Sequence, residues 1–142
     1  MKLHIITVGA PKLDYAKSGW DDYRQRLDRY HRLRISHIAD KKSDAAHLLA
    51  TAGSSYKVVL AVAGQPLSSE QLSDFLQQRA RQGREVSFMI GGPAGLPPAV
   101  NRQADFCWSL SRLTFPHDLA MVILLEALYR ASTIAAGRPY HK

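Results

Sequence analysis

The sequence predicts an α/β domain with a largely parallel sheet, and three observations support this class. Short apolar segments alternate along the chain with segments of helical periodicity. Residues 58–62 and 85–90 are mainly apolar runs, as expected for strands that are covered on both faces. The chain has 142 residues, of which 46% are hydrophobic and 22% are charged, so its size and composition suit one compact domain.

Five segments have the pattern of strands. They are residues 3–8, 33–38, 58–62, 85–90 and 106–110. The first run stops at Gly9 and Pro11, which favour a turn, and the fourth leads directly into a glycine-rich turn. Residues 33–38 alternate between polar and apolar types, which is the period of a strand.

The segments between these strands have helical periodicity. From Gly19 onward, apolar and aromatic side chains recur every three or four residues, at positions 20, 23, 27 and 30. A short helix is expected within residues 41–53. Ser68 or Ser69 is expected to cap a helix that ends near Gly83, and residues 117–136 are expected to form one long helix.

The balance of charge is strongly basic. The chain carries 19 Lys and Arg against 12 Asp and Glu, and its formal net charge of +7 attracts polyanions such as nucleic acid or an anionic membrane. Four arginines lie off the apolar stripe of the first predicted helix: Arg24, Arg26, Arg29 and Arg32. They form either a solvated basic face or a contact surface for RNA phosphates.

Cysteine usage and hydropathy both point to the cytoplasm. Cys107 is the single cysteine, so an internal disulfide is excluded and a reducing compartment is expected. Its neighbours Phe106 and Trp108 indicate a buried, structural thiol. The longest apolar stretch, residues 119–125, is far shorter than the roughly 20 residues that span a bilayer, and no secretory signal is apparent at the amino end.

Three loops are candidates for the functional site, because ligands of parallel α/β sheets collect beyond the carboxyl ends of the strands. They are residues 63–66, 91–97 and 111–116. The second contains Gly91-Gly92-Pro93-Ala94-Gly95, which matches neither a Walker loop nor a dinucleotide-binding pattern. It is either a plain tight turn or a place where the backbone approaches a ligand closely. The histidines lack the spacing of zinc ligands, so no metal is expected.

The last predicted helix and the tail carry further signals. Residues 119–125 are apolar on all sides, so this helix is expected to be buried on most sides or to pack against another chain, which predicts a subunit interface. Glu126 and Arg130 are four residues apart and can pair, either as an exposed stabilising contact or as a buried pair that orients the site loop. The tail, residues 138–142, combines basic and aromatic side chains as single-stranded RNA recognition does, although a short tail on its composition alone is expected to fray.

Four motifs in the carboxyl-terminal half identify a family. They are IGGPAG at residues 90–95, WSLSRLTFPH at 108–117, LEALYRA at 125–131 and PYHK at 139–142. Taken together, in this order and at this spacing, they make the chain resemble the ribosomal RNA large-subunit methyltransferase H family, which consists of small SPOUT-class enzymes. The likeness extends from Met1 to Lys142.

The resemblance implies a fold, an assembly and an activity. The fold is a single SPOUT domain over residues 1–142, an α/β trefoil knot with a mainly parallel sheet, helices on both faces and the knotted region at about residues 85–142. The assembly is a homodimer. The activity is transfer of a methyl group from S-adenosyl-L-methionine to N3 of a pseudouridine in a hairpin loop of 23S rRNA, on the assembled ribosome and without a metal.

The resemblance also implies site residues. The expected cofactor contacts are Leu60, Gly92, Ser111, Arg112, Leu113, Thr114, Phe115 and Pro116. The expected catalytic residues on the RNA side are His141, Tyr140 and Arg130, with the tail supplied by the partner subunit and His141 helping to take the N3 proton. Three positions depart from the family pattern, since Ala61, Ala94 and Met121 stand where Asp, Glu and Arg are usual.

Two alternatives remain open at this point. The first is a SPOUT methyltransferase that acts on ribose or on transfer RNA. The second is a non-catalytic ribosome-binding or assembly module with the same fold, which the loss of two acids and one base near the expected site favours.

Overall fold

The computed structural model describes residues 1–142 and contains one five-stranded sheet in which every pairing is parallel. The spatial order of the strands is β2-β1-β4-β3-β5. The strands are β1 (Lys2–Val8), β2 (Arg32–Ile38), β3 (Tyr56–Pro66), β4 (Val86–Ile90) and β5 (Phe106–Ser109). The helices are α1 (Asp14–Leu27), α2 (Ala45–Ala52), α3 (Ser69–Arg81), α4 (Pro98–Gln103) and α5 (His117–Ala135), with a short 3-10 turn at Asp40–Lys42. The predicted α/β class is confirmed.

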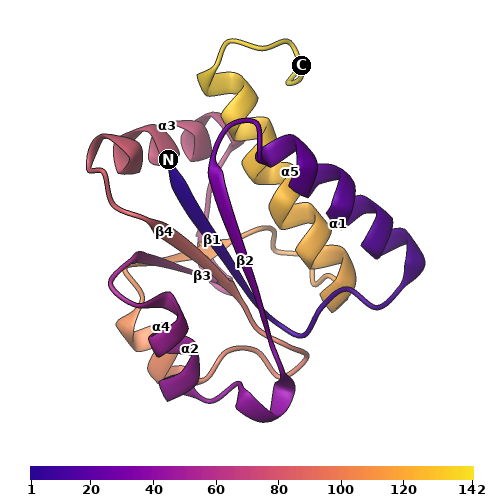
Figure 1. Ribbon diagram of the computed structural model, residues 1–142, viewed down its shortest axis with the longest axis vertical. Coiled ribbons are helices and arrows are strands. Elements are labelled where there is room, and N and C mark those ends of the chain that lie inside the picture. Colours follow the sequence, from indigo (N-terminus) through magenta and orange to yellow (C-terminus); the bar gives the residue numbers. More distant parts are fainter.

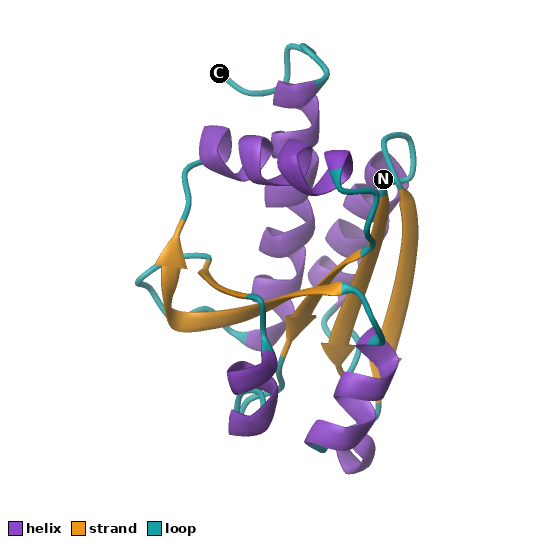
Figure 2. Ribbon diagram, turned by 90° about the vertical axis from the view of Figure 1, so that its left-hand side faces the viewer, coloured by secondary structure: helices purple, strands orange, loops and turns teal.

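The helices form two layers, one on each face of the sheet (Figure 1, Figure 2). Helices α1, α3 and α5 cover one face, with α5 packed between α1 and α3. Helices α2 and α4 cover the other face. The chain termini both lie at the end of the molecule where β1 begins (Figure 1).

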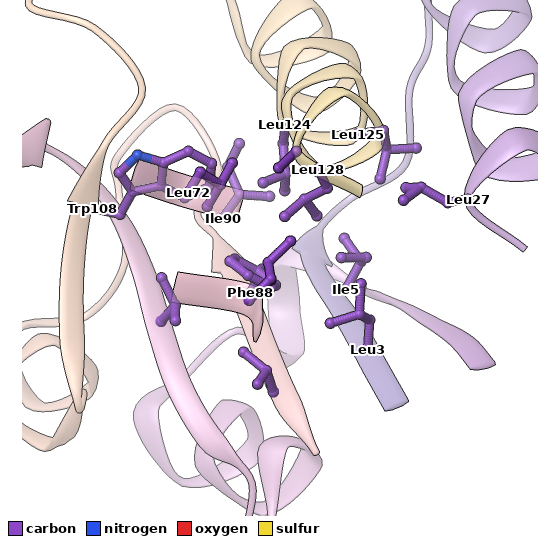
Figure 3. Close-up of a cluster of buried hydrophobic side chains, with 14 of the residues drawn as sticks. Leu3, Ile5, Leu27, Leu72, Phe88, Ile90, Trp108, Leu124, Leu125 and Leu128 are labelled. Atoms are coloured by element: carbon purple, nitrogen blue, oxygen red, sulfur yellow. The ribbon is translucent and has the colours of Figure 1, made fainter. Parts of the chain in front are cut away.

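The larger hydrophobic core lies between the sheet and α5. Leu124, Leu125 and Leu128 of α5 are fully buried in the same cluster as Phe88 of the central strand β4 (Figure 3). Trp108 of β5 packs edge-on against Phe88, with 5.9 Å between the ring centroids. Each fully buried side chain of this size contributes roughly 1.5–3 kcal/mol to folding. Burial against its own sheet therefore explains the apolar residues on the inner side of the last helix.

Helix boundaries agree with the sequence where local signals are strong. Ser68 caps α3, accepting a hydrogen bond from the N–H of Gln71, whose side chain bonds back to the N–H of Ser68. Helix α5 covers almost the whole predicted range. Helix α1 begins at Asp14 rather than near Gly19, and α4 has no counterpart among the predicted helices.

Strand β3 is longer than predicted, since it runs from Tyr56 to Pro66 and not only over residues 58–62. Val58 and Val59 are buried as predicted for a doubly covered strand, but the side chain of Val62 is 59% exposed. The reason is an irregularity in the pairing with β5, where Trp108 lies opposite both Leu60 and Gln65. The intervening residues bulge away from the sheet.

Two further expectations from the sequence concern membrane-spanning segments and the burial of Cys107. None of the helices combines the length and apolar character that crossing a bilayer requires. Cys107 is a free cysteine in β5, and it is half-buried rather than fully buried, packed against the core on the α2 and α4 side of the sheet.

Candidate functional site

A cavity of about 460 Å³ lies beyond the carboxyl ends of β3, β4 and β5, where the sequence places the candidate loops. Small-molecule sites typically have volumes of roughly 300–1,000 Å³, so this one can hold an organic cofactor. The cavity is lined by Leu60, Ala61, Val62, Ile90, Gly91, Gly92, Pro93, Ala94, Gly95, Leu96, Asn101, Leu110, Ser111, Leu113, Thr114, Phe115, His117 and Ala120. None of them is an acid, a lysine or an arginine, so the cavity offers mainly apolar walls and backbone polar groups.

The glycine turn forms one wall, and two of its glycines are required by geometry. A Cβ atom on Gly91 would lie 2.5 Å from the carbonyl carbon of Gly95, closer than any side chain tolerates. Gly95 has φ of +79°, the left-handed region that favours glycine, and its N–H donates to the carbonyl of Gly92 over 2.9 Å. The interpretation as a tight turn is confirmed, and the turn also forms a wall of the cavity, while the close approach of a ligand stays a prediction.

The loop over residues 111–116 forms the opposite wall and holds its own shape. The hydroxyl of Ser109 donates to the carbonyl of Ser111 over 2.9 Å, and the hydroxyl oxygen of Ser111 accepts from the N–H of Leu113 over 3.0 Å. Such side-chain to backbone bonds are how serine stabilises a turn. The loop therefore presents its backbone to the cavity in a defined conformation.

The third wall differs from the sequence-based prediction of a loop at residues 63–66. These residues continue β3, and the cavity is lined instead by Leu60, Ala61 and Val62, at the start of the bulge. The prediction of a loop was wrong because an apolar run gives no sign that the strand resumes pairing after an interruption. The neighbouring position Leu60, expected to contact the cofactor, does line the cavity.

The amino end of α5 adds residues that sequence reasoning missed. His117 lines the cavity, and its Nε2–H donates to the carbonyl of Val8 at the end of β1 over 2.9 Å. The next residue, Asp118, accepts hydrogen bonds from the N–H groups of Lys12 and Leu13. The bond from Leu13 is the main reason that the pKa of Asp118 lies below its ordinary value. The sequence does contain a sign that His117 lies at the site, because this histidine begins the predicted helix directly after the candidate loop at residues 111–116.

The expected cofactor residues largely converge on this cavity. Leu60, Gly92, Ser111, Leu113, Thr114 and Phe115 line it. Arg112 and Pro116 belong to the same loop but are not among the lining residues.

The three departures from the family pattern lie in two different environments. Ala61 and Ala94 line the cavity, so the absence of acids there changes its wall directly. Met121 is fully buried in the core among the leucines of α5, where it is an apolar core residue and does not line the cavity.

The expected catalytic residues form a second cluster. Arg130 pairs with Glu126 over 2.8 Å, its guanidinium lies 4.9 Å from the ring centroid of Tyr140, and it bonds to His141. The Glu126 carboxylate raises the pKa of Arg130, which therefore stays charged. Of the two roles considered for this pair, the structure shows a half-buried pair that holds the tail and does not contact the loop at residues 111–116.

The bonds of His141 define its protonation. The guanidinium of Arg130 can only donate, so Nδ1 of His141 accepts, over 3.1 Å. Its Nε2–H then donates to the carboxylate of Glu70 at the start of α3, over 2.8 Å. Glu70 has a lowered pKa, chiefly because its carboxylate accepts from its own backbone N–H and also because of His141. Both ring nitrogens are thus engaged.

The tail is anchored, contrary to the fraying that its composition predicts. The ring of Tyr140 packs edge-on against Tyr129 at 4.7 Å, and its hydroxyl lies 3.2 Å from that of Tyr23 in α1. Burial, together with the contact to Tyr23, raises the pKa of Tyr140 to about 12. The phenol is therefore neutral at physiological pH.

The two clusters lie at opposite ends of α5. His117 begins the helix beside the cavity, whereas Arg130 lies 13 residues later, about 20 Å along the helix axis at 1.5 Å per residue. The tail turns over at the carboxyl end of α5 and packs back onto Tyr129 and Arg130, so it stays at that end of the helix (Figure 1). The structure therefore does not bring Arg130, Tyr140 and His141 to the cavity of their own subunit.

The outer side of α5 is less covered than its inner side. Met121, Leu124 and Leu128 are buried, whereas Leu119 and Ile123 are half-buried. An apolar side of this kind is compatible with the predicted subunit interface, which stays a prediction.

Comparisons with known proteins agree with this geometry. The family model described as predicted SPOUT methyltransferase matches residues 1–141. The chain is 50% identical over 145 residues to ribosomal RNA large subunit methyltransferase H of Deinococcus radiodurans, covering all (100%) of this chain and 99% of that protein. It is 40% identical over 142 residues to the protein of the same name from Thermus thermophilus, with coverage of 100% and 99%.

Solved structures show the same fold. A tRNA (m1G37) methyltransferase from Aquifex aeolicus gives a TM-score of 0.60 at 12% identity, covering 99% of this chain and 74% of that one. A probable methyltransferase from Bordetella pertussis gives a TM-score of 0.60 at 10% identity, covering 92% and 96% of the two chains.

Proposed function

Because the chain belongs to the SPOUT methyltransferase family, we propose that it transfers a methyl group from S-adenosyl-L-methionine to N3 of a pseudouridine in a hairpin loop of 23S rRNA, on the assembled ribosome. Relatives named for methylation of large-subunit ribosomal RNA, identical at 40% to 50% of positions, support the choice of substrate. The observation that carries the proposal is the cavity at the carboxyl ends of β3, β4 and β5.

The residues of the cavity fit the methyl donor. The donor carries a cationic sulfonium, and the lining contains no lysine or arginine to repel it. Leu60, Leu110 and Phe115 supply apolar walls suited to adenine, and the glycine turn leaves room for close approach to its polar portion. Because Ala61 and Ala94 provide no carboxylate, we expect backbone carbonyls and the side chains of Asn101 and Thr114 to bind the polar groups of the donor.

The donor, when bound, supplies a methyl group that is already activated for in-line attack. The main role of this chain is then alignment. Holding the donor and the base in line and excluding water removes a large part of the activation barrier to methyl transfer. The loop at residues 111–116 and the glycine turn hold the donor from two sides. No group of the cavity has to act as a strong nucleophile.

We further propose that the complete site is shared between two subunits. Arg130 lies about 20 Å from its own cavity along α5, and Tyr140 and His141 pack against Arg130. If two copies pack through the half-buried outer side of α5 with the helices antiparallel, each tail comes to the cavity of the other copy. The homodimer and the knotted region at about residues 85–142 are parts of this proposal.

In this arrangement the tail handles the N3 proton. His141 supplies the imidazole of this cluster, the side-chain type suited to accept and release protons. Its Nδ1 lone pair accepts from Arg130. His141 accepts a substrate proton at Nδ1 only when Arg130 turns to another acceptor, and a phosphate of bound RNA is a suitable one.

Methylation of ribosomes tests the activity. Ribosomes that lack the modification are incubated with the protein and S-adenosyl-L-methionine, and the rRNA is digested and measured by mass spectrometry. We expect a mass gain of one methyl group on one pseudouridine of 23S rRNA. Methyl transfer to ribose or to transfer RNA would favour a different SPOUT activity, and failure of the folded protein to bind the donor in calorimetry would favour a non-catalytic module.

Mixed dimers test the shared site. One variant lacks residues 139–142, and the other carries Gly92→Leu, which places a side chain in the cavity. Each alone is expected to be inactive. After exchange, about a quarter of wild-type activity returns, because half of the dimers are mixed and each has one complete site. No recovery, although native mass spectrometry detects the mixed dimer, would show that the tail does not act across the interface.

A further inference from the structure

A basic groove lies at the opposite edge of the sheet from the cavity. This amino-end groove has a volume of about 490 Å³ and lies where β1 and β2 begin and α3 ends. Its lining includes Lys2, Arg29, Arg32 and Arg84 but only one acid, Asp28. The methyl-transfer proposal makes no use of these residues.

A second hollow extends this groove toward the tail. It has a volume of about 480 Å³ and shares Arg29 and Tyr30 with the amino-end groove. It adds Arg138, and none of its lining residues is an acid. Together the two hollows form a continuous basic track from the start of β1 to the carboxyl-terminal tail.

Four cations of this track form no ion pair, whereas two arginines of α1 are paired. Arg84 differs from these four, since its guanidinium donates to the carbonyls of Ser54 and Ser55. Arg24 pairs with Asp28 and Arg26 with Asp22, so half of the arginines singled out in the sequence are engaged within the protein. Arg29 is exposed and forms no ion pair. The same holds for Lys2, Arg32 and Arg138.

We propose that the amino-end groove and its extension bind the phosphodiester backbone of RNA, at a place remote from the methyl-transfer cavity of the same subunit. The length of the track suits a polymer, and its guanidinium groups can contact phosphates through two donors each. The inference rests on the proposed function for the identity of the polyanion. A free nucleotide would fill one hollow only, and an acidic peptide lacks the regular charge spacing of a nucleic acid.

The position of the track fits the shared site. The seven residues of β1 separate the groove from the cavity of the same subunit by about 20 Å, at roughly 3.3 Å per residue. Arg138 borders the tail residues that are proposed to reach the cavity of the partner subunit. The track of one subunit then leads to the cavity of the other, so the RNA that presents the target base contacts both copies.

The salt dependence of RNA binding tests the proposal. The double variant Arg29→Gln/Arg32→Gln is compared with the wild-type protein by fluorescence anisotropy, using a labelled hairpin RNA at several KCl concentrations. The plot of log affinity against log salt is expected to lose about 1.4–1.8 units of slope, since each phosphate contact contributes roughly 0.7–0.9. Affinity at low salt falls roughly tenfold or more.

Two control variants distinguish the effect of positive charge in the amino-end groove from the effect of positive charge elsewhere on the surface. Arg29→Lys/Arg32→Lys keeps both charges and is expected to retain most of the slope. Arg102→Gln removes an exposed cation from α4, on the other face of the sheet, and is expected to leave the affinity within about twofold of wild type.

The outcomes distinguish this inference from the proposed function. We expect the Gln variant to bind S-adenosyl-L-methionine as the wild type does, and to methylate ribosomes with a raised KM and an unchanged kcat. Two results would refute RNA binding by the groove without bearing on the proposed methyl transfer. One is an unchanged salt slope in the Gln variant, and the other is competition by polyglutamate that is as strong as competition by polyuridylate. Lack of donor binding by the wild-type protein would instead refute the proposed function. The salt dependence of RNA binding would still show whether the groove binds RNA.

Discussion

The carboxylate of Asp118 accepts a hydrogen bond of 2.6 Å from the backbone N–H of Leu13, 105 residues earlier in the chain. The same oxygen accepts from the N–H of Lys12 over 2.8 Å. Leu13 precedes α1, and Asp118 lies in the first turn of α5, next to the cavity residue His117. This contact joins the loop after β1 to the helix that supports the cavity.

Replacing Asp118 with alanine is expected to lower the free energy of unfolding by about 1–3 kcal/mol, because two backbone N–H groups lose a charged acceptor. The pKa of Asp118 is lowered in the folded protein, so its contribution is complete above the ordinary value of 3.8 and is lost as the pH falls through the lower folded value. Urea unfolding of both proteins at pH 7 and pH 3 measures this. A difference that stays the same or grows at the lower pH would contradict the assignment.

The two adjacent glycines of the cavity turn are expected to respond differently to alanine. Gly91→Ala places a Cβ 2.5 Å from backbone and should cost about 1–3 kcal/mol or more of stability. At Gly92 the nearest atom is Cγ1 of Val8 at 3.4 Å, so Gly92→Ala should keep the fold but weaken binding of S-adenosyl-L-methionine. Thermal unfolding and calorimetry separate the two effects, and equal losses of stability would contradict the structure.

His31 is expected to make stability depend on pH. Its Nε2–H donates to the hydroxyl of Ser132 over 2.8 Å, its Nδ1 is buried without a partner, and burial lowers its pKa to about 4. The unfolded chain binds the proton more tightly, so this stabilisation is complete above about pH 6.5 and declines as the pH falls toward 4. The expected loss is about 2 kcal/mol between pH 7 and pH 5.

The control for this prediction is His31→Gln, which keeps a side-chain amide near Ser132 but does not titrate. Its free energy of unfolding, measured in urea across the same pH range, should change less than that of the wild type. Parallel pH profiles for the two proteins would show that another group is responsible.

Arg130→Lys is expected to affect methyl transfer far more than stability. Lysine keeps the charge opposite Glu126 but loses the planar fork that also contacts His141 and lies over Tyr140. Stability should change by about 1 kcal/mol or less, because the pair is only half-buried. Methylation of ribosomes should fall at least about tenfold, with donor affinity unchanged because the cavity lies about 20 Å away along α5.

A matched control exists on α1. Arg26 also pairs with a carboxylate four residues away, Asp22, and lies over the ring of Tyr129. Arg26→Lys is expected to leave methyl transfer within about twofold of wild type. Equal losses in the two variants would indicate that a general change in the aromatic cluster, not the position of the tail, controls the rate.

Local patterns predicted the elements with strong signals. The apolar run before Gly91 marks β4, whose five residues are all buried, and the Ser68 capping box marks the start of α3. The glycine turn and the loop at residues 111–116 follow strands, and parallel strands bring both to one edge of the sheet. These features depend on neighbours in sequence or on a general property of parallel sheets.

Other features depend on contacts that no local pattern encodes. Strand β3 continues past its apolar run because β5 pairs with it again at Gln65 and Pro66. Helix α4 is six residues long, too short for a clear periodicity. The tail is ordered through Tyr140 and Tyr23, which are 117 residues apart.

The alternation of strands and helices, two of the loops that line the cavity and the family could all be read from the amino-acid sequence, because they depend on period, turn chemistry and motif spacing. By contrast, the placement of the cavity and the tail cluster at opposite ends of α5 depends on how the helix packs across the sheet. The direction of a long helix across the sheet separates residues that the motifs place close together in sequence. That separation is the reason why we propose that a second copy of the chain completes the site.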